Sequence, residues 1–218
     1  MKYAEIKEYT GEIYNKIVQE QNIIIIAEKG KFFLSNRSPT LSDPSAIESV
    51  SDYGIAKVIW IGKSRILQPF INFEKIPLKL IEQLNLMKKI HQNKKGSLSL
   101  IHGDFSNNNL TNYGNEVKCF DYEHSHWGNP YVDIGRIILR ECTSQEDIDF
   151  VLDNYFYKRP SAKELKQGFL VFCQRHYEMR HEKNQAFQEI PKLRAKRLLK
   201  SNLTLNEILH SFKDPVIL

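Results

Sequence analysis

The 218-residue sequence is poor in cysteine and lacks any long hydrophobic run. Its longest aliphatic run, Ile23 to Ala27, is far shorter than the roughly 20 residues of a membrane-spanning helix. The first residues contain several acidic side chains and no apolar core, so we expect no signal peptide. The scattered, odd-numbered cysteines predict neither a disulfide framework nor a zinc knuckle: Cys119, Cys142 and Cys173. These absences favour a cytoplasmic protein without a membrane segment.

Composition and charge are those of an ordinary globular protein. Hydrophobic residues make up 41% of the chain and charged residues 26%, which excludes collagen-like and wholly disordered classes. We find no internal repeat and no low-complexity tract. The formal net charge is +5, a mild surplus that suits an anionic ligand such as a nucleotide. The same surplus does not by itself indicate a nucleic-acid partner.

The pattern of the chain changes at about residue 72. Before it, two β-branched or aromatic stretches, within residues 22–34 and 57–67, each enclose a glycine-bearing turn and predict hairpins. Pro69 should end the second hairpin, because proline has no N–H for the ladder. Between the hairpins, Asp43 as N-cap and Pro44 at the first position predict a helix that ends near Gly54. Residues 1–71 therefore predict a β-rich N-terminal lobe.

Residues 72–218 are mostly helical in pattern. Apolar residues recur at helical spacing over 77–92, and the helical pattern returns after Pro130. Ser161 and Glu164 match the capping-box pattern of a helix start. Only the stretch from Leu98 to about Glu123 is non-helical. The fold class predicted is α+β with two lobes, and the cleft between lobes is where a ligand is expected.

The non-helical stretch contains the polar residues that could take part in catalysis or bind a metal ion. Two short β-like runs, 110–112 and 117–120, flank a turn and predict a hairpin. Its ends should bring Asp104 and Asn109 close to Asp121 and Glu123. Two or three carboxylates at such range repel one another unless a cation joins them. Oxygen ligands of this kind suit Mg²⁺, and a further Asp could accept the proton of a substrate hydroxyl. The arrangement predicts phosphoryl transfer.

Three consecutive motifs resemble the aminoglycoside phosphotransferase and choline kinase superfamily. The first is His102-Gly103-Asp104 with Asn109, and the others are Asp121-Tyr122-Glu123 and Gly128-Asn129-Pro130 followed by Asp133 to Arg136. The order of the two lobes agrees with this resemblance, which implies a protein-kinase-like fold.

The resemblance also implies roles for individual residues. Asp104 would be the catalytic base, and Asn109 and Asp121 would bind Mg²⁺. Phe70 and Ile71 would belong to the hinge that holds adenine through backbone groups. By the same resemblance, Asp133 would anchor the catalytic loop from below. Apart from the resemblance, three further residues could support the site: His102, which we expect to fix the loop by hydrogen bonding, Glu123 and Lys31.

The sequence departs from this family in the N-terminal lobe. The family usually has a lysine on the third strand after an apolar triplet, whereas Ser35 follows Phe32 to Leu34 here. Arg37 could supply the missing charge to the phosphates, with Glu48 of the first helix as its carboxylate partner. No glycine-rich phosphate loop is visible. These gaps leave open weak nucleotide binding, an unusual nucleotide or a degenerate kinase.

Two single motifs suggest other functions, a zinc site and a nucleic-acid surface, and the sequence favours neither. His124 and His126 suggest zinc, but no third or fourth ligand stands at a suitable spacing. The basic segment 192–200 suggests nucleic acid, but its leucines favour a helix with a solvated outer face.

The sequence thus predicts a small-molecule kinase that uses Mg²⁺ and transfers the γ-phosphate of ATP or GTP. The acceptor would be a hydroxyl of an amino alcohol, a sugar, a vitamin or an aminoglycoside. Two alternatives remain, a non-catalytic pseudokinase-type binding module and a kinase acting on a protein or RNA partner.

Overall fold

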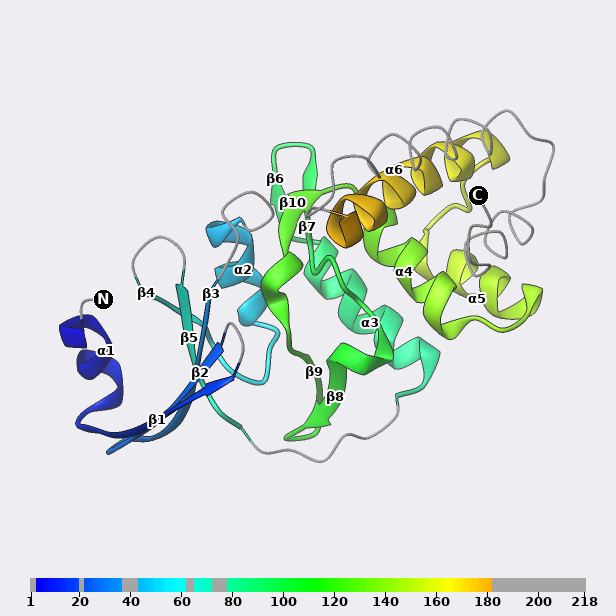
Figure 1. The fold of residues 1–218 in the computed structure, drawn as a ribbon. Coiled ribbons are helices and arrows are strands. Elements are labelled where there is room, and N and C mark those ends of the chain that lie inside the picture. The colour runs from blue at the N-terminus through cyan, green and yellow to red at the C-terminus, as the bar shows by residue number, and fades with distance from the viewer. Residues whose placement is uncertain (1–2, 20–21, 37–42, 62–64, 72–77, 182–218) are drawn as a thin grey trace.

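The computed structural model describes residues 3–19, 22–36, 43–61, 65–71 and 78–181 of the chain (Figure 1). Arg37 and the basic segment 192–200 lie outside the described residues.

A five-stranded antiparallel sheet with two helices forms the N-terminal part (Figure 1). Its elements follow in chain order: α1 (Tyr3–Thr10), β1 (Ile13–Gln19), β2 (Asn22–Ala27), β3 (Gly30–Asn36), α2 (Pro44–Ser51), β4 (Ile59–Ile61) and β5 (Arg65–Pro69). The strand order is β1-β2-β3-β5-β4. Both predicted hairpins are confirmed, and the Asp43 side chain accepts the N–H groups of Ser45 and Ala46 as an N-cap. The sequence analysis missed α1 and β1.

Helices dominate the C-terminal part, interrupted by short strands. Its elements are α3 (Leu80–His91), β6 (Lys94–Lys95), β7 (Leu98–Ile101), the 3-10 turn η1 (Asn107–Asn109), β8 (Leu110–Tyr113), β9 (Glu116–Cys119), the 3-10 turn η2 (Tyr122–His124), β10 (His126–Gly128), α4 (Tyr131–Glu141), α5 (Gln145–Tyr155) and α6 (Ala162–His181). Strands β8 and β9 form the predicted hairpin, and β10, β7 and β6 form a separate sheet. The predicted capping box at Ser161 is present, with reciprocal bonds to Glu164 of 2.8 and 3.3 Å.

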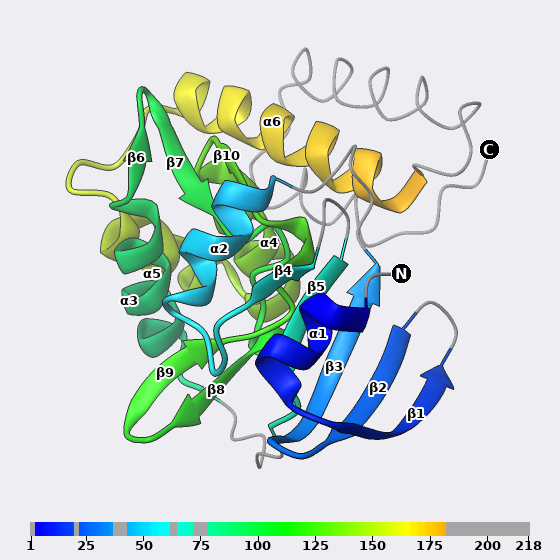
Figure 2. The same ribbon diagram turned by 90° about the vertical axis from the view of Figure 1, so that its left-hand side faces the viewer.

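The two faces of the N-terminal sheet pack into different cores. One face packs against α1 (Figure 2) through Ile6, Ile25, Leu34 and Leu67. The other face contributes Ile66 to the large core of the helical part, which α2 also joins. The lobe boundary that we predict between residues 71 and 72 is therefore not a boundary between hydrophobic cores.

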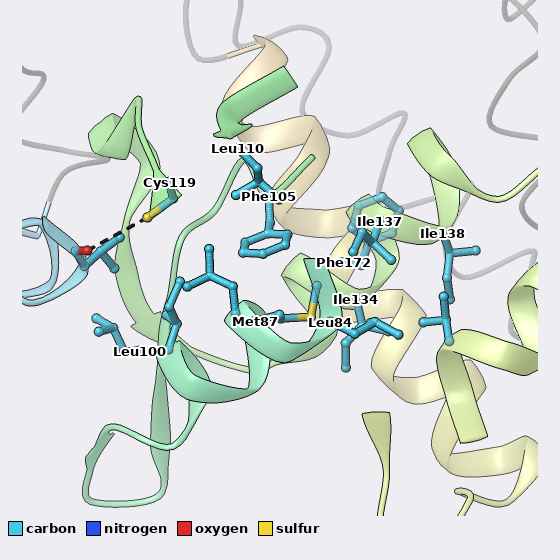
Figure 3. Close-up of a cluster of buried hydrophobic side chains, with 14 of the residues drawn as sticks. Leu84, Met87, Leu100, Phe105, Leu110, Cys119, Ile134, Ile137, Ile138 and Phe172 are labelled. Atoms are coloured by element: carbon cyan, nitrogen blue, oxygen red, sulfur yellow. Dashed lines mark hydrogen bonds between the residues drawn. The ribbon is translucent and has the colours of Figure 1, made fainter. Parts of the chain in front are cut away.

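The large core holds the segment that leads into the hairpin. Phe105 is fully buried, and Figure 3 shows its ring among side chains of α3, α4 and α6. Leu110 and Cys119, paired across the β8–β9 hairpin, are fully buried in the same core. Because these residues flank Asp104 and Asn109 in the chain, burial of their apolar surface fixes the polar residues between them.

Helix α4 lies unusually close to α6. A Cβ atom added at Gly135 would come within 2.4 Å of the Phe172 ring, and one added at Gly168 within 2.3 Å of the Tyr131 ring. The two glycines let the helices approach each other. This packing fixes the position of α4 beneath the polar loop, residues 102–106, between β7 and η1.

The β-rich N-terminal part and the helical C-terminal part confirm the predicted α+β, two-lobed fold class. No helix in the described part of the chain combines the length and the apolar character that a membrane crossing requires.

Candidate active site

The loop that joins β7 to η1 contains a glycine, Gly103, at a position where any side chain would be strained. Gly103 has φ +85, in the left-handed region, and a Cβ atom there would lie 2.1 Å from the backbone oxygen of His124. Both the backbone angle and the close approach require glycine. The loop is therefore pressed against the segment that follows β9.

Asp133 of α4 binds this loop from below. Its two carboxylate oxygens each accept a backbone N–H at 2.8 Å, from His102 and from Gly103. Burial alone raises the pKa of Asp133, but the hydrogen bond and the charge of His91 outweigh it and leave the pKa below its usual value. Asp133 is therefore ionised at neutral pH, and its contacts are those that the family resemblance implies.

His102 connects the loop to the end of β9. Its Nε2 atom lies 3.0 Å from the backbone oxygen of Phe120, and its ring is fully buried. Burial is the main reason why the pKa of His102 lies below its ordinary value. A neutral ring that donates from Nε2 suits this contact, so His102 has a structural place in the loop.

Asp104 is held on both carboxylate oxygens. Oδ1 forms an ion pair with the guanidinium group of Arg136 on α4. Oδ2 accepts a hydrogen bond of 3.1 Å from Nδ2 of Asn109, which also donates to the Asp104 backbone oxygen at 2.9 Å. The Asp104 side chain keeps 21% of its surface exposed, so it is fixed and still accessible.

The hairpin brings the second half of the site to Asn109, as the sequence predicts. Leu110 pairs with Cys119, and the backbone N–H of Phe120 donates to the backbone oxygen of Asn109 at 3.0 Å. Asp121 follows at once, exposed and in the left-handed conformation with φ 61 and ψ 58. Aspartate adopts this conformation more readily than most residues.

Glu123 takes no part in a larger cluster. Its carboxylate lies 3.4 Å from Nε2 of His124 within η2. Among the described residues, no group of three or more His, Cys, Asp or Glu side chains is placed to hold a metal ion. The convergence of Asp104, Asp121 and Glu123 on one cation therefore stays a prediction.

The N-terminal lobe does not reproduce the lysine–glutamate pair of the family. The Ser35 side chain is 1% exposed, and its Oγ atom is buried without a hydrogen-bond partner. Glu48 lies on the exposed side of α2 and forms no ion pair within the part of the chain that the structure describes. Position 35 is thus a buried, uncharged site, and the predicted pair of Glu48 with Arg37 stays a prediction, because Arg37 lies outside the described residues.

One backbone donor of the predicted hinge segment after β5 already forms a hydrogen bond within the N-terminal sheet. The backbone N–H of Phe70 donates to the backbone oxygen of Lys31 at 2.8 Å. The Nζ atom of Lys31 lies 4.0 Å from the centre of the Phe70 ring, in a cation–π contact. Adenine binding through the Phe70 N–H would therefore compete with the sheet, which leaves Ile71 as the better backbone donor.

Two residues around the loop, His91 and Tyr155, were not identified from the sequence, and Arg136 was named there only as part of a motif, without a role. Arg136 lies three positions after Asp133 on α4, and this helical spacing could have indicated that both face the loop. His91 lies 2.7 Å from the Tyr155 hydroxyl through Nδ1, but no local pattern relates the C-terminal end of α3 to α5.

The arrangement is a protein-kinase-like fold, which the chain shares with several solved structures. The chain is similar to a putative fructosamine-3-kinase from Thermobifida fusca YX-ER1, with a TM-score of 0.59, 11% identity and coverage of 90% of this chain and 97% of that one. It is also similar to the ethanolamine kinase of Plasmodium vivax (TM-score 0.57, 11% identity, coverage 88% and 85%). The third is the choline kinase LicA of Streptococcus pneumoniae (TM-score 0.52, 10% identity, coverage 90% and 96%).

No family model and no curated protein matches the sequence. At identities near 10%, the likeness to solved structures establishes the fold alone.

Proposed function

We propose that the protein is a kinase that transfers the γ-phosphoryl group of ATP or GTP to a hydroxyl of a small molecule. The observation that carries this proposal is the Asp104 carboxylate, accessible and fixed between Arg136 and Asn109 in a protein-kinase-like fold. The acceptor belongs to the class of amino alcohols, sugars, vitamins and aminoglycosides.

In this proposal Asp104 is the catalytic base. A substrate hydroxyl donates its hydrogen bond to Oδ2, which has a lone pair left beside the bond from Asn109. The carboxylate orients the hydroxyl toward the γ-phosphorus and accepts its proton as the new O–P bond forms. The bond between the γ-phosphorus and the oxygen that bridges it to the β-phosphate breaks, and ADP or GDP leaves. A positioned base of this kind contributes about 10²–10⁴-fold to the rate.

Mg²⁺ is the proposed cofactor, held by Asn109 and Asp121. The donor set fits, because Nδ2 of Asn109 is turned toward Asp104 and the carboxamide is left to bind a cation through Oδ1. Carboxylate and carboxamide oxygens are ligands that Mg²⁺ prefers, and it usually adds water and phosphate oxygens. When bound, the ion would neutralise charge on the phosphate oxygens.

The nucleotide is proposed to lie between the sheet and the polar loop. The solved structure of LicA with AMP, a fold neighbour with a TM-score of 0.54, supports a nucleotide site in this chain. Ile71 is the proposed backbone contact to the base. Lys31 and Arg37 are the proposed cations of the N-terminal lobe, and Glu48 the proposed partner of Arg37.

A nucleotide-consumption screen tests the proposal. The purified protein is incubated with ATP or GTP, Mg²⁺ and a panel of hydroxylated metabolites and antibiotics, with the Asp104→Asn protein as the blank. We expect the wild-type protein to consume nucleotide in the presence of one acceptor class, and the Asp104→Asn protein to consume none. Equal consumption by both proteins with every acceptor would contradict the proposal.

The closed site at Ser35 favours a second candidate, a non-catalytic binding module with a kinase-like fold. Thermal unfolding with and without Mg-nucleotide separates the two. A nucleotide at 100 times its dissociation constant stabilises the folded state by about 2.7 kcal/mol. Absence of any shift with ATP and GTP would favour the binding module.

A further inference from the structure

The Asp104 carboxylate has a partner that the proposed reaction does not require. Arg136 reaches it from the second turn of α4, and the arginine is 8% exposed. A buried ion pair is weak evidence for stability, because desolvating both charges offsets their attraction. A buried guanidinium at the proposed base therefore calls for a functional explanation.

Helix α4 holds the loop at two points. Asp133 binds the backbone N–H groups of His102 and Gly103, and Arg136, one helical turn later, binds the side chain of Asp104. Residues three apart lie on the same helix face. One rigid face of α4 thus fixes both the backbone of the loop and the orientation of its carboxylate.

Arg136 also places a positive charge in direct contact with the proposed base, whereas position 35 of β3 carries none. Position 35 on β3 is a buried serine, and the amine of Lys31 lies over the Phe70 ring. A base, a second carboxylate at Asp121 and a triphosphate would otherwise gather negative charge in one place. A cation in contact with Asp104 reduces this repulsion.

We propose that Arg136 is a positioning residue for phosphoryl transfer, an inference that rests on the proposed function. It holds Oδ1 of Asp104, so that Oδ2, on the side of Asn109, is presented to the acceptor hydroxyl. Its charge compensates the carboxylate beside the phosphates. Arg136 acts through Asp104 and contacts neither substrate.

Steady-state kinetics of three variants test this role. Arg136→Gln should lower kcat by about 10- to 100-fold, the range seen when an outer group that orients a metal ligand is removed. The KM for nucleotide should stay unchanged, because the nucleotide does not touch Arg136. Arg136→Lys should recover part of kcat, since it keeps the charge and loses the planar fork. Arg140→Gln, exposed on the same helix, is the matched control and should behave as wild type.

A double variant shows whether Arg136 acts through Asp104. In the Asp104→Asn background, Arg136→Gln should have no further effect on the residual rate, because its target is already lost. An equal loss in both backgrounds would overturn the inference, as would wild-type kcat in Arg136→Gln. If Arg136→Gln unfolds, Arg136→Lys decides, and wild-type kcat in that variant contradicts the role.

The same measurements distinguish failure of the Arg136 role from failure of the proposed kinase function. An inactive Asp104→Asn with a fully active Arg136→Gln would overturn the role of Arg136 and leave the kinase proposal intact. A wild type that transfers no phosphate to any acceptor, and so equals Asp104→Asn, would overturn both.

Discussion

The Nε2 atom of His91 lies 3.0 Å from Oδ2 of Asp133, and both side chains are buried almost completely. The pair joins α3 to α4 and stands directly behind the loop that carries Asp104. The same oxygen of Asp133 accepts the His102 N–H, so the pair links the helical core to the candidate active site.

This pair gives the first prediction. Asp133→Ala leaves two backbone N–H groups and His91 buried without their partner, so we expect a loss of about 3–5 kcal/mol in the free energy of unfolding. Denaturant titration measures it. Asp153→Ala, which removes an exposed ion pair with Arg159, is the control and should change stability little. Similar midpoints for both variants would contradict the anchoring role.

The second prediction concerns pH. Burial lowers the pKa of His102, so the folded state binds its proton less readily than the unfolded state, whose histidine titrates near pH 6.5. Below about pH 6.5 the unfolded state gains protons that the folded state does not, and stability falls until the pH reaches the folded-state pKa.

Thermal unfolding between pH 5 and 8 measures this effect. His102→Gln keeps a hydrogen-bond donor and removes the titration, so its melting temperature should depend less on pH over this range. His126, whose pKa burial also lowers, acts in the same direction and remains in both proteins. Parallel pH curves for wild type and variant would show that His102 does not contribute.

Gly103 gives the third prediction. Gly103→Ala must accept a positive φ and a Cβ atom 2.1 Å from the His124 oxygen, so the loop has to move. Gly114→Ala is a matched control, because it has φ +61 and open space around the added atom. We expect Gly114→Ala to cost about 1–2 kcal/mol of stability, the penalty of the backbone angle. Gly103→Ala should cost clearly more and abolish turnover.

Much of the fold follows from local sequence patterns. Short runs of residues predict three of its features: the β2–β3 hairpin, the N-cap at Asp43 and the β8–β9 hairpin. Helix α1 and strand β1 were missed because their apolar residues follow no regular helical or alternating spacing. Tyr14 and Val18 of β1 are exposed at the sheet edge, so neither helical nor alternating periodicity marks them.

The part of the candidate site that the β8–β9 hairpin brings together was predictable from the sequence. The turn between β8 and β9 brings Asn109 next to Phe120, which sequence spacing alone implies. The contact between His91 and Asp133 was not predictable in this way, because it depends on how α3 and α4 pack. The burial of Ser35 and the exposure of Glu48 likewise follow from tertiary packing, which a propensity does not encode.

Asp121 gives the last prediction, which concerns the metal. If Asp121 is a Mg²⁺ ligand, Asp121→Ala should remove the Mg²⁺-dependent part of the thermal shift produced by ATP or GTP, because the ion joins the protein to the phosphates. Glu123→Gln, two residues further on and paired with His124, is the control and should keep the shift. Asp121→Ala removes no core packing, since Asp121 is exposed, but alanine must adopt the left-handed backbone angle there, so the unliganded melting temperature should fall modestly and the Mg²⁺-dependent shift is measured relative to it. A full Mg²⁺-dependent shift in Asp121→Ala would exclude Asp121 as a ligand and would move the proposed metal site to Asn109 and Asp104.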